Sequence, residues 1–536
     1  MKKLLLLAIV FSISVLNVFS QEFLPKGLTE KEKELYHDFI HNPNRPKSTT
    51  PPAVAPRTPA EWEEAQGVIV TWAAYNAELR EIVRRAKEAV TVYIICSNPS
   101  TVQSYLTSGG VTLTNIVFVT APFNSVWVRD YGPQSVYLEN GDLAIIDWLY
   151  NRPSRPQDNA IPQYMANYLG LPFYQMGGSN GMLITTGGNF MADGHDDGYS
   201  SKLVLSENPS YNETQINQIK YSFMGIERYI KMNELPYDNI HHIDMHMKLL
   251  DEETLLVGQF PAGVSDGPFI EANLQYVLNN FQTEFGREFK VIRIPMVPST
   301  SGNWPPNAHY RTYTNALILN NVVLVPQYHN ATLNAQAISI YQNAMPGYQV
   351  FGINMENVIS ASGAIHCITR EIAASDPVHI SHAKIRSAMV NEPYYTVNAT
   401  ITSPSGLSGA VVYWTTNPGS GFNAINMTNT DDVYYANIPA QSYNTNVSYY
   451  ISATNNNSKT ISKPLVAPAG YYTFKVGAPN GDVNGDGYVN VMDVVWLISH
   501  LNGNTPVGFL LENADVNKDG SINIADITAL INLILS

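Results

Sequence analysis

Cysteine is scarce in this 536-residue chain, which has only Cys96 and Cys367. Two cysteines do not make the disulfide framework that stabilises small secreted domains, and a chain of this length does not need one. Each cysteine is half of a single disulfide, a small buried apolar residue or a reactive thiol. Cys96 ends the β-branched run TVYIIC, which predicts a buried strand, so we interpret it as a core residue. A Cys96–Cys367 disulfide is the alternative.

Basic patches are also lacking. The net charge is −14, and no run of Lys or Arg follows the N-terminus. A general nucleic-acid binder needs a basic face, so this class of protein is excluded. The acidity instead suits the attraction of cationic ligands.

Long apolar runs are missing after residue 20, so no later segment is predicted to span a bilayer. The first 20 residues, MKKLLLLAIVFSISVLNVFS, place two lysines before a short apolar run and end in small residues. This pattern predicts a signal peptide that is cut before Gln21, with a single membrane anchor as the alternative. We expect a secreted or cell-surface protein with no transmembrane segment after cleavage.

The length predicts about two to four domains. Residues 21–55 are polar and proline-rich, and we interpret them as a leader or linker without a core element. Residues 56–390 alternate strand-like and helix-like runs, which predicts an α/β domain. The strand-like runs include GVIVTW, KLVLSE and VIS, and the helix-like runs include ELREIVRRAKEA and ETQINQIKYSFM.

Residues 391–477 differ in composition, because short runs rich in Tyr, Val and Thr are separated by clusters of Asn, Gly, Ser and Pro. This pattern predicts an immunoglobulin-like β-sandwich. No Cys–Trp–Cys pattern is present, so a true antibody-type domain is excluded. The alternative is an irregular β extension of the preceding domain.

Residues 478–536 hold an internal repeat, in which DVNGDGYVNVMD (482–493) recurs as DVNKDGSINIAD (515–526). Each copy has oxygen-bearing residues at the ligand positions of a twelve-residue calcium loop, with Gly at position 6 for the sharp turn. An apolar helix-like run follows each loop, and the last ligand is Asp rather than the Glu of an EF-hand. Two ordinary Asx turns are the alternative. The predicted calcium ligands are Asp482, Asn484, Asp486, Tyr488, Asn490, Asp493, Asp515, Asn517, Asp519, Ser521, Asn523 and Asp526.

This duplicated pattern resembles a type I dockerin, a small all-α module. The resemblance implies two structural Ca²⁺ ions and a cohesin-like partner. A module that serves only stability or surface sorting is the alternative.

Four stretches of the α/β region carry reactive side chains: SVWVRDYGPQSVY, NIHHIDMHMKLL, YRTYTNALILNN and ASGAIHCITREI. Each has a purely structural alternative. Asp130 beside Arg129 suits an ion pair, Asn315 suits a turn cap, and Cys367 suits a packed core. His242, Asp244 and His246 alternate along a predicted strand face, which suits a transition-metal site.

Taken together, a Cys, a His and two carboxylates suit attack on a guanidinium carbon. The cation is planar and carries its hydrogens in a fork that carboxylates accept bidentately. Two carboxylates would fix the cation and balance its charge while a thiolate adds to the central carbon. A His would protonate the departing ammonia and then activate water. The guanidinium itself would favour the thiolate.

Six motifs occur in order over roughly residues 56–385: PAEWEEAQGVIVTW, WVRDYGP, GGNFMADG, HHID, YTNALILNN and GAIHCITRE. They resemble the agmatine deiminase/peptidylarginine deiminase superfamily, and the secreted bacterial peptidylarginine deiminases most. The resemblance implies a five-bladed α/β propeller, the pentein fold, with the active site on its axis and no catalytic metal or cofactor. It implies that Cys367 is the nucleophile, His242 the general acid/base, and Asp130 and Asp244 the guanidinium ligands.

The same resemblance implies that Asn315 orients the substrate or the thiolate. Asn189 and Asp193 lie in the shared motif GGNFMADG without an assigned role. His246 and His366 match no role in the family, and we interpret them as structural.

The part of the substrate beyond the guanidinium separates the branches of the superfamily. The run YNRPSRPQDN (150–159) supplies Arg152 and Arg155, whose forks suit a carboxylate. The bacterial peptidylarginine deiminases resemble this run and hold the C-terminal carboxylate of the substrate with such a pair. Ser154 leaves the register of the second arginine open, and a solvated loop is the alternative. The family also implies that Trp127 packs on the aliphatic stem of the substrate.

We therefore predict a secreted hydrolase that deiminates peptidyl-arginine, at a C-terminal arginine, to citrulline and ammonia through a covalent Cys thiouronium intermediate. One alternative is an agmatine or other small-guanidine deiminase. The other is a catalytically silent, calcium-dependent surface or scaffold protein.

Overall fold

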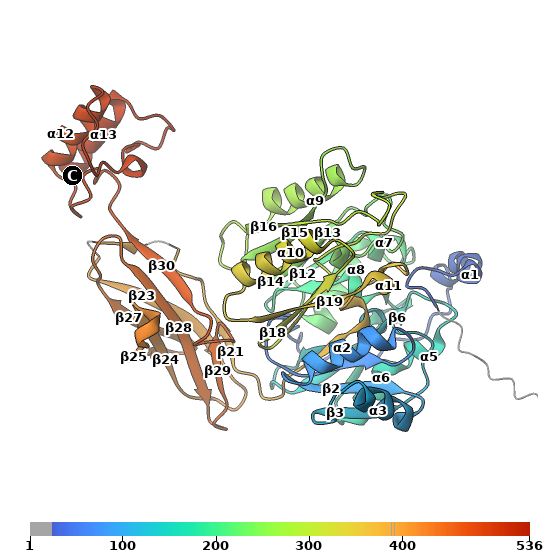
Figure 1. Ribbon diagram of the computed structural model, residues 1–536. Coiled ribbons are helices and arrows are strands. Elements are labelled where there is room, and N and C mark those ends of the chain that lie inside the picture. Colours follow the sequence, from blue (N-terminus) through green and yellow to red (C-terminus); the bar gives the residue numbers. More distant parts are fainter. Residues whose placement is uncertain (1–23, 387, 391, 536) are drawn as a thin grey trace, which may run out of the picture.

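The computed structural model describes residues 24–386, 388–390 and 392–535, so the predicted signal peptide lies outside the described residues. Figure 1 shows a large α/β body, an elongated β body beside it and a small helical body at the C-terminal end. Each body has an apolar core of its own. The predicted order of an α/β domain, a β domain and a helical module is thus the order along the chain.

Five sheets of three or four strands build the α/β body, and four of these five share one design. Two short two-stranded sheets add to them in the described residues: β6 (Leu149–Tyr150) with β10 (Ile184–Thr185), and β8 (Gly177–Gly178) with β9 (Gly181–Met182). In each of the four, the first two strands are antiparallel, and the third strand is parallel to the second. A parallel step needs a crossover connection, which is helical in each case. The strands are β4 (Gln134–Tyr137), β5 (Leu143–Asp147) and β7 (Phe173–Gln175); β11 (Met191–Ala192), β12 (Asp197–Ser201) and β13 (Arg228–Met232); β14 (Met247–Asp251), β15 (Thr254–Gln259) and β16 (Lys290–Pro295); and β17 (Leu317–Leu319), β18 (Val322–Gln327) and β19 (Gln349–Asn354).

The fifth sheet joins the two ends of the α/β body. β1 (Ala65–Thr71) is parallel to β2 (Thr91–Cys96), and β3 (Ile116–Thr120) continues the sheet beyond β2. The last strand of the body, β20 (Arg370–Ala373), pairs antiparallel with β1. The body is therefore closed by its own first and last strands. The predicted strands GVIVTW and TVYIIC are confirmed, and Cys96 is buried at the end of β2 as expected of a core residue.

Amphipathic helices cover the sheets. Helix α8 (Glu213–Met224) begins with a capping box, in which the side chains of Asn212 and Gln215 each accept the backbone N–H of the other. It ends at Gly225 in the left-handed conformation, where a Cβ would lie 1.8 Å from the carbonyl oxygen of Pro56. The crossover helices are α2 (Asn76–Ala86), α3 (Pro99–Ser108), α6 (Ile161–Leu169), α8 (Glu213–Met224), α9 (Gly267–Asn280) and α10 (Ala331–Ala344). The helices predicted from ELREIVRRAKEA and ETQINQIKYSFM are confirmed as α2 and α8.

Two of the predicted strands are wrong. KLVLSE lies in α7 (Leu203–Ser206), and the strand beside it is β12, formed by the polar run DGYSS. All five residues of β12 are buried because it is the middle strand of its sheet, and its composition does not reveal this. Val358 and Ile359 of VIS lie in α11 (Glu356–Ile359), and Ser360 follows as its C-terminal cap. The prediction failed because a run of three residues is too short to separate strand from helix.

The leader also differs from its prediction, because it contains a helix and buried side chains. Helix α1 (Glu30–Ile40) begins with a capping box between Thr29 and Glu32 and lies at one edge of the α/β body (Figure 1). Lys26 and Glu32 are fully buried, and Arg45 is nearly so. The partners of these charged residues lie far along the chain, so a polar, proline-rich composition could not predict their burial.

Two sheets enclose the core of the β body, with the orders β21-β23-β27-β26 and β22-β30-β28-β24-β25, and β29 pairs with β28. Buried and exposed residues alternate along β23, as the Tyr/Val/Thr runs predict for a strand with one face in a core. The strands are β21 (His379–Ser381), β22 (Ala388–Met389), β23 (Tyr394–Thr402), β24 (Leu407–Thr415), β25 (Asn423–Asn426), β26 (Thr428–Thr430), β27 (Val433–Pro439), β28 (Asn446–Asn455), β29 (Thr460–Lys463) and β30 (Tyr472–Gly477). Because β21 and β22 belong to these sheets, the β body begins before the predicted boundary at residue 391.

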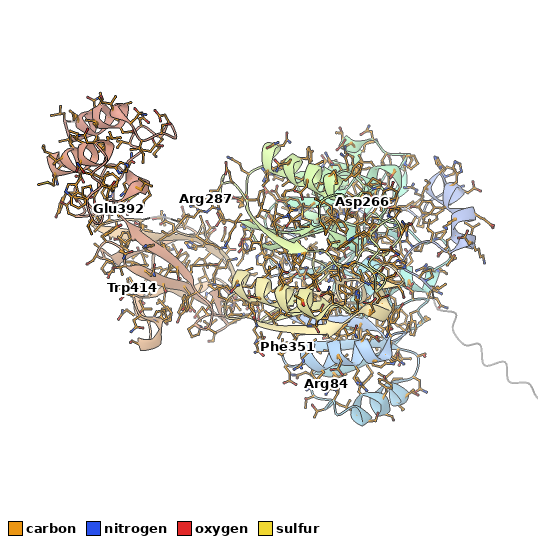
Figure 2. The ribbon with its side chains drawn as sticks, turned by 45° about the horizontal axis from the view of Figure 1, so that its top comes forward. Arg84, Asp266, Arg287, Phe351, Glu392 and Trp414 are labelled. Carbon is orange, nitrogen blue, oxygen red and sulfur yellow. The ribbon has the colours of Figure 1, made fainter. Side chains whose placement is uncertain are left out.

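Charged side chains join the β body to the α/β body. Lys384 Nζ lies 2.5 Å from Asp251, and a guanidinium nitrogen of Arg386 lies 2.7 Å from Glu253. Arg287, labelled near the junction in Figure 2, donates to the carbonyl oxygen of Lys384 at 2.7 Å. The two bodies therefore meet through specific ion pairs and hydrogen bonds.

The C-terminal body consists of two loops, each followed by a helix. The helices α12 (Val491–Leu501) and α13 (Ile524–Leu535) pack against each other, and Leu497 and Leu530 are fully buried in their shared core. Both helices are the apolar runs predicted after the repeated loops. Over the part of the chain that the structure describes, no helix has the length and apolar character needed to cross a bilayer.

Candidate active site

Five side chains singled out in the motifs come from equivalent places in the five larger sheets of the α/β body. Each lies two to four residues before the first strand of a sheet. They are Asp130 in α4 (Val128–Tyr131) before β4, Asn189 in η1 (Gly187–Asn189) before β11, Asp244 in η2 (Ile243–Met245) before β14, Asn315 before β17, and Cys367 in η3 (His366–Ile368) before β20. α4 packs against η1 and η3, and η1 packs against η2. The starts of the five sheets therefore meet at one centre and bring these residues together.

Cys367 lies fully buried at this centre. The side-chain nitrogen of Asn315 lies 3.2 Å from Cys367 Sγ, and the side-chain oxygen of Asn315 accepts the backbone N–H of Cys367 at 3.4 Å. The Oδ2 atom of Asp244 lies 3.9 Å from the same Sγ. Both Cys96 and Cys367 are free, so the disulfide alternative is wrong.

Asp130 and Asp244 are both buried at the centre. Asp130 accepts the backbone N–H of Gly188 at 3.3 Å, and Asp244 pairs with Nδ1 of His366 at 2.8 Å. Burial raises the pKa of Asp130, and the charge of Asp244 adds to this shift although Lys26 opposes it. Burial also disfavours the charged form of Asp244, but Lys26 and His366 outweigh it and hold the pKa of this carboxyl well below its usual range. Asp244 is therefore ionised.

His242 is buried beside the carboxylates, with Nδ1 3.6 Å from Oδ1 of Asp130. Among the described residues, neither ring nitrogen of His242 has a hydrogen-bond partner. Burial, followed by the positive charge of Lys26, holds the pKa of the imidazole well below its usual value, so the ring is neutral. A neutral imidazole without a partner can accept a proton and return it.

The cation at the centre is Lys26 of the leader. Its Nζ lies 2.7 Å from Cys367 Sγ and 3.8 Å from Oδ1 of Asp130. Burial alone lowers the pKa of a lysine, but the charges of Asp130 and Asp244 outweigh burial and raise the pKa of Lys26 above its usual value. Burial and the two carboxylates raise the pKa of the Cys367 thiol to about 12, although Lys26 opposes this shift. The centre thus holds an ammonium ion beside a protonated thiol.

The backbone of the leader is bound on both sides of the Lys26 side chain. The backbone N–H of Lys26 donates to the carbonyl oxygen of Ala361 at 3.2 Å, and the indole N–H of Trp127 donates to that of Leu24 at 2.9 Å. Nε and Nη2 of Arg152 both donate to the carbonyl oxygen of Lys26, at 2.9 and 2.6 Å. The centre therefore holds a peptide segment with one basic side chain directed at the thiol.

Arg155 binds the next part of the leader. Its guanidinium pairs with the carboxylate of Glu32 at 3.0 Å and donates to the carbonyl oxygen of Gly27 at 3.1 Å. Both side chains of the ion pair are fully buried, and Arg155 holds the pKa of Glu32 at about 2 although burial opposes this shift. Arg152 is also buried, at 6% exposure, so the alternative of a solvated loop with two surface arginines is wrong.

His366 and Glu61 lie behind Asp244 and were not predicted to take part in the site. His366 contacts Asp244 through Nδ1 and Glu61 through Nε2, at 2.8 and 3.1 Å. Glu61 is fixed in turn by Lys248, whose Nζ lies 2.7 Å from the same carboxylate. His366 therefore sets the orientation of a site carboxylate in addition to filling space. Glu61 belongs to the motif PAEWEEAQ, and this membership is the signal that could have found it.

Other residues singled out in the motifs hold the backbone or each other. Arg129 forms a bidentate pair with Glu371 at 2.6 and 3.0 Å, so its ion pair is not made with the neighbouring aspartate. Asn189 accepts the backbone N–H of Ser201 at 2.9 Å, and Asp193 accepts backbone N–H groups of its own loop. These contacts position loops around the centre.

The alternative of a metal site at His242, Asp244 and His246 fails on geometry. These residues do not alternate along a strand, because Ile243–Met245 forms a single 3-10 turn. Within the described ranges, the three side chains are not among the groups whose ligand atoms lie close enough to share a metal ion.

The repeated loops of the C-terminal body have a matching internal structure. Asp482 accepts backbone N–H groups of its loop, and Asp493 closes the loop by accepting the N–H of Val483 at 2.9 Å. In the second loop Asp515 accepts the N–H groups of Asp519 and Gly520, and Asp526 accepts that of Asn517 at 3.1 Å. The glycines at position 6 have φ values of 91° and 85°, in the left-handed region that favours glycine. Carboxylate and amide oxygens around such a turn are the donors that calcium prefers.

The sequence profile of the Porphyromonas-type peptidyl-arginine deiminases matches residues 57–372, which is more than half of the chain. The chain belongs to this family. Residues 480–535 match the type I dockerin domain, which implies calcium binding. Both resemblances stated from the motifs are thereby confirmed.

Relatives of this deiminase carry two kinds of name. A Vibrio parahaemolyticus protein named as an agmatine deiminase is 26% identical over 371 residues, which are 61% of this chain and 99% of that protein. A crystal structure named as a peptidyl-arginine deiminase superposes with a TM-score of 0.53 at 18% identity, covering 60% of this chain and 99% of that one. The agmatine deiminase of Enterococcus faecalis superposes with a TM-score of 0.51 at 20% identity, covering 59% and 96%. These structures show that the α/β body has the deiminase fold.

Gly188 tests the geometry of the deiminase centre. A Cβ at this position would lie 2.6 Å from Nδ1 of His242 and 2.8 Å from Oδ1 of Asp130. We therefore expect Gly188→Ala to move both groups and to lower kcat/KM by about 100-fold, as displacements near 1 Å do in enzyme sites. The control is Gly267→Ala, where a Cβ would meet its nearest neighbour at an ordinary 3.6 Å. Steady-state kinetics measures kcat/KM of both variants, and circular dichroism checks that both are folded. Equal kcat/KM values for the two folded variants would contradict the prediction.

Proposed function

We propose that the protein is an exported hydrolase that converts arginine in peptides, preferentially a C-terminal arginine, to citrulline and ammonia. The observation that carries this proposal is a peptide segment bound at the centre with a basic side chain 2.7 Å from Cys367 Sγ. Cys367 acts as the nucleophile and His242 as the general acid and base. Asp130 and Asp244 bind the guanidinium.

The position of Lys26 Nζ indicates where the guanidinium carbon of a substrate would lie. Nζ is the fifth atom beyond Cα in lysine, and the guanidinium carbon Cζ is the fifth atom beyond Cα in arginine. Nζ lies 2.7 Å from Sγ, whereas reacting atoms in a near-attack arrangement lie about 3–3.5 Å apart. An arginine in place of Lys26 therefore needs only a small outward shift to present its carbon to the thiol.

The electrostatics of the centre suit a planar cation. Asp130 and Asp244 bring two buried carboxylates to one place, and a guanidinium can pair with both through its fork of N–H donors. A bound guanidinium also lowers the pKa of the neighbouring Cys367 thiol, because a positive charge favours the thiolate. Asn315, whose side-chain nitrogen lies 3.2 Å from Sγ, holds the sulfur in position.

The first half of the proposed reaction forms the covalent intermediate. Sγ of Cys367 bonds to the guanidinium carbon while the thiol proton passes to His242, which gives a neutral tetrahedral adduct. The protonated His242 then gives its proton to one nitrogen of the adduct, the C–N bond breaks and ammonia leaves. A thiouronium linked to Cys367 remains.

The second half hydrolyses this intermediate. His242, neutral again, takes a proton from water as the water oxygen bonds to the thiouronium carbon. The C–S bond breaks as the C=O bond of citrulline forms, and the hydroxyl proton returns to the Cys367 thiolate. His242 passes its proton to solvent, which restores the starting enzyme.

Backbone contacts at the centre support a peptide over agmatine. Trp127 and Arg152 each donate to a backbone carbonyl oxygen of the bound leader, and the carbonyl oxygen of Ala361 accepts a backbone N–H of the leader. Agmatine has no backbone carbonyl or peptide N–H to make these contacts. The Arg152 fork directs two donors at one carbonyl oxygen, and a C-terminal carboxylate in its place would offer an oxygen to each donor. Arg155 already binds a carboxylate, that of Glu32.

The proposal extends to the architecture and the other domains. Five sheets that all begin at one centre support a five-bladed pentein propeller for residues 56–390, and the two sheets that follow support an immunoglobulin-like sandwich.

The two repeated loops support one Ca²⁺ each, held by the ligands predicted from the sequence, and the dockerin domain supports a cohesin-like partner. Dockerin domains are typically extracellular, which supports export to the medium or the cell surface.

A panel of three substrates tests the proposed function. We expect citrulline from a peptide with a C-terminal arginine, less from a peptide with an internal arginine, and little reaction of agmatine, each assayed up to saturating concentration. Turnover of agmatine alone would show that the protein is a small-guanidine deiminase. No turnover of any of the three, with Cys367 shown to be reduced, would favour a silent scaffold protein.

The two cysteines provide a matched pair of variants. Cys367→Ser should lower kcat by at least about 10⁴-fold, as the loss of a catalytic nucleophile does in other hydrolases. Cys96→Ser should cost about 1–3 kcal/mol of stability, since it buries a hydroxyl in the core, but should retain activity. Citrulline release and thermal unfolding measure the two effects, and substantial activity of Cys367→Ser would contradict the proposed nucleophile.

Arg152→Lys tests recognition of the C-terminal carboxylate. Hydrogen bonds to charged groups contribute about 1.5–3 kcal/mol, so this variant should raise KM for a peptide ending in arginine by about 10- to 100-fold. The measured quantity is the ratio of kcat/KM between that peptide and its C-terminal amide, because the leader competes equally with both. The control is Arg84→Lys on the outer helix α2 (Figure 2). An unchanged ratio in Arg152→Lys would show that the carboxylate is read elsewhere.

Chelation tests the division between the dockerin domain and the catalytic domain. Removing Ca²⁺ should unfold residues 478–535, since the loops lose the ion that holds their carboxylates together. Deiminase activity should be retained, because the predicted ligands lie outside the α/β body. Limited proteolysis and citrulline release before and after chelation check this prediction, with Asp486→Ala as the genetic counterpart and Asp431→Ala as its control. A loss of activity on chelation would contradict it.

A further inference from the structure

We propose that residues 24–32, which we name the pseudosubstrate segment, inhibit the enzyme from within the same chain by occupying its substrate site. The segment uses the contacts that the proposed reaction requires for substrate. The choice of arginine peptides as assay substrates rests on the proposed function. The contact between the Lys26 ammonium and the Cys367 thiol does not depend on it.

The side chain of Lys26 fills the guanidinium position with the correct charge and the wrong chemistry. Its ammonium contacts Cys367 at 2.7 Å and Asp130 at 3.8 Å, so the buried carboxylates have a cation and the thiol is covered. Lysine has a nitrogen where arginine has an electrophilic carbon, so Cys367 has nothing to attack. The complex is therefore stable toward the reaction that an arginine would undergo.

The backbone of the segment takes the contacts proposed for a substrate peptide. Arg152 donates two hydrogen bonds to the carbonyl oxygen of Lys26, and Trp127 donates one to that of Leu24. Arg155 pairs with the carboxylate of Glu32 and is therefore not available for the carboxylate of a substrate. A substrate and the pseudosubstrate segment cannot be bound at once, because they need the same donors.

Contacts beyond the centre keep the segment in place. Glu32 and Arg155 form a fully buried ion pair, which Ser154 supports with a hydrogen bond to Glu32 at 2.7 Å. Further along the leader, Arg45 donates to the side-chain oxygen of Asn208 at 2.7 Å. The segment is therefore held at its side chains and its backbone, and not through one lysine alone.

Inhibition of this kind changes the apparent affinity for substrate and not the chemical step. A segment tethered next to its site acts at an effective concentration on the order of millimolar, so it competes strongly with dilute substrate. The apparent KM equals the intrinsic KM divided by the fraction of molecules whose site is open. Saturating substrate restores the full kcat.

The first test compares Lys26→Ala with the wild-type full chain and with Lys33→Ala. Lys33 lies in the same leader, on α1, but its side chain is 57% exposed and its ammonium pairs with Glu30 at 2.7 Å. We expect Lys26→Ala to lower KM for an arginine peptide by at least about tenfold with kcat little changed, and Lys33→Ala to behave as wild type. Glu32→Gln, which weakens the pairing with Arg155, gives a second variant should Lys26→Ala fold poorly.

A second measurement does not depend on the substrate. Chloroacetamidine carries a planar cation and alkylates thiols, so its rate of reaction at Cys367 reports whether the guanidinium position is open. We expect Lys26→Ala to be alkylated at least about tenfold faster than the wild type and Lys33→Ala. Peptide mapping identifies the modified cysteine.

A third test uses the equal reach of the two basic side chains. Lys26→Arg puts a guanidinium carbon at the position of Nζ, so the segment should become a substrate and residue 26 should be converted to citrulline within the same chain. Lys33→Arg is the matched control and should keep its arginine. Mass spectrometry of the leader peptide distinguishes citrulline from arginine at each of these positions.

The outcomes separate this inference from the proposed function. Faster alkylation of Lys26→Ala without turnover of any guanidine would support the pseudosubstrate segment and overturn the proposed function. Equal alkylation rates and equal KM values in Lys26→Ala, Glu32→Gln and wild type would overturn the pseudosubstrate segment, even if arginine peptides are turned over. Faster alkylation together with a lower KM supports both.

Discussion

Two carboxylates buried together require a cation, and the centre of the catalytic domain is arranged around this requirement. Asp130 and Asp244 lie beside the neutral His242 and the Cys367 thiol, where burial alone would favour their protonated forms. A cation between them restores their charge and lowers the cost of burial. Lys26 meets this need in the structure, and a guanidinium meets it in the proposed reaction, so one electrostatic constraint explains both the occupant and the substrate class.

The fold meets this constraint by repetition. Each sheet contributes the turn before its first strand, so five distant parts of the sequence each need to supply only one or two side chains. Small residues then allow the close approach, as at Gly363, where a Cβ would lie 2.5 Å from the Trp127 ring and 3.1 Å from Cβ of Cys367. Glu61 and His366 add a second layer that holds Asp244 from behind. Precise placement therefore comes from the framework and not from local sequence around any single residue.

The sequence predicted which motif side chains lie together at the centre better than it predicted their surroundings. Cys367, His242, Asp130 and Asp244 could be named because motif order carries family identity, and strands such as TVYIIC could be named because apolar runs predict burial. DGYSS could not be recognised as a strand, since only its middle position in a sheet buries it. Lys26 could not be found either, because a lone lysine in a polar leader has no local pattern, and its partners lie more than 100 residues away.

The pairing of β20 with β1 has a consequence for how the enzyme is made. These strands are the last and first of the catalytic domain, and Cys367 lies directly before β20. During synthesis, four sheets can form before the segment with Cys367 has emerged, since domains fold from the N-terminus as the chain grows. The domain closes only when this last strand docks on the first, a contact between ends far apart in sequence and therefore slow to form. The Cys367 thiol thus enters the centre at the final step of folding, so a prematurely terminated chain has a scaffold without this thiol.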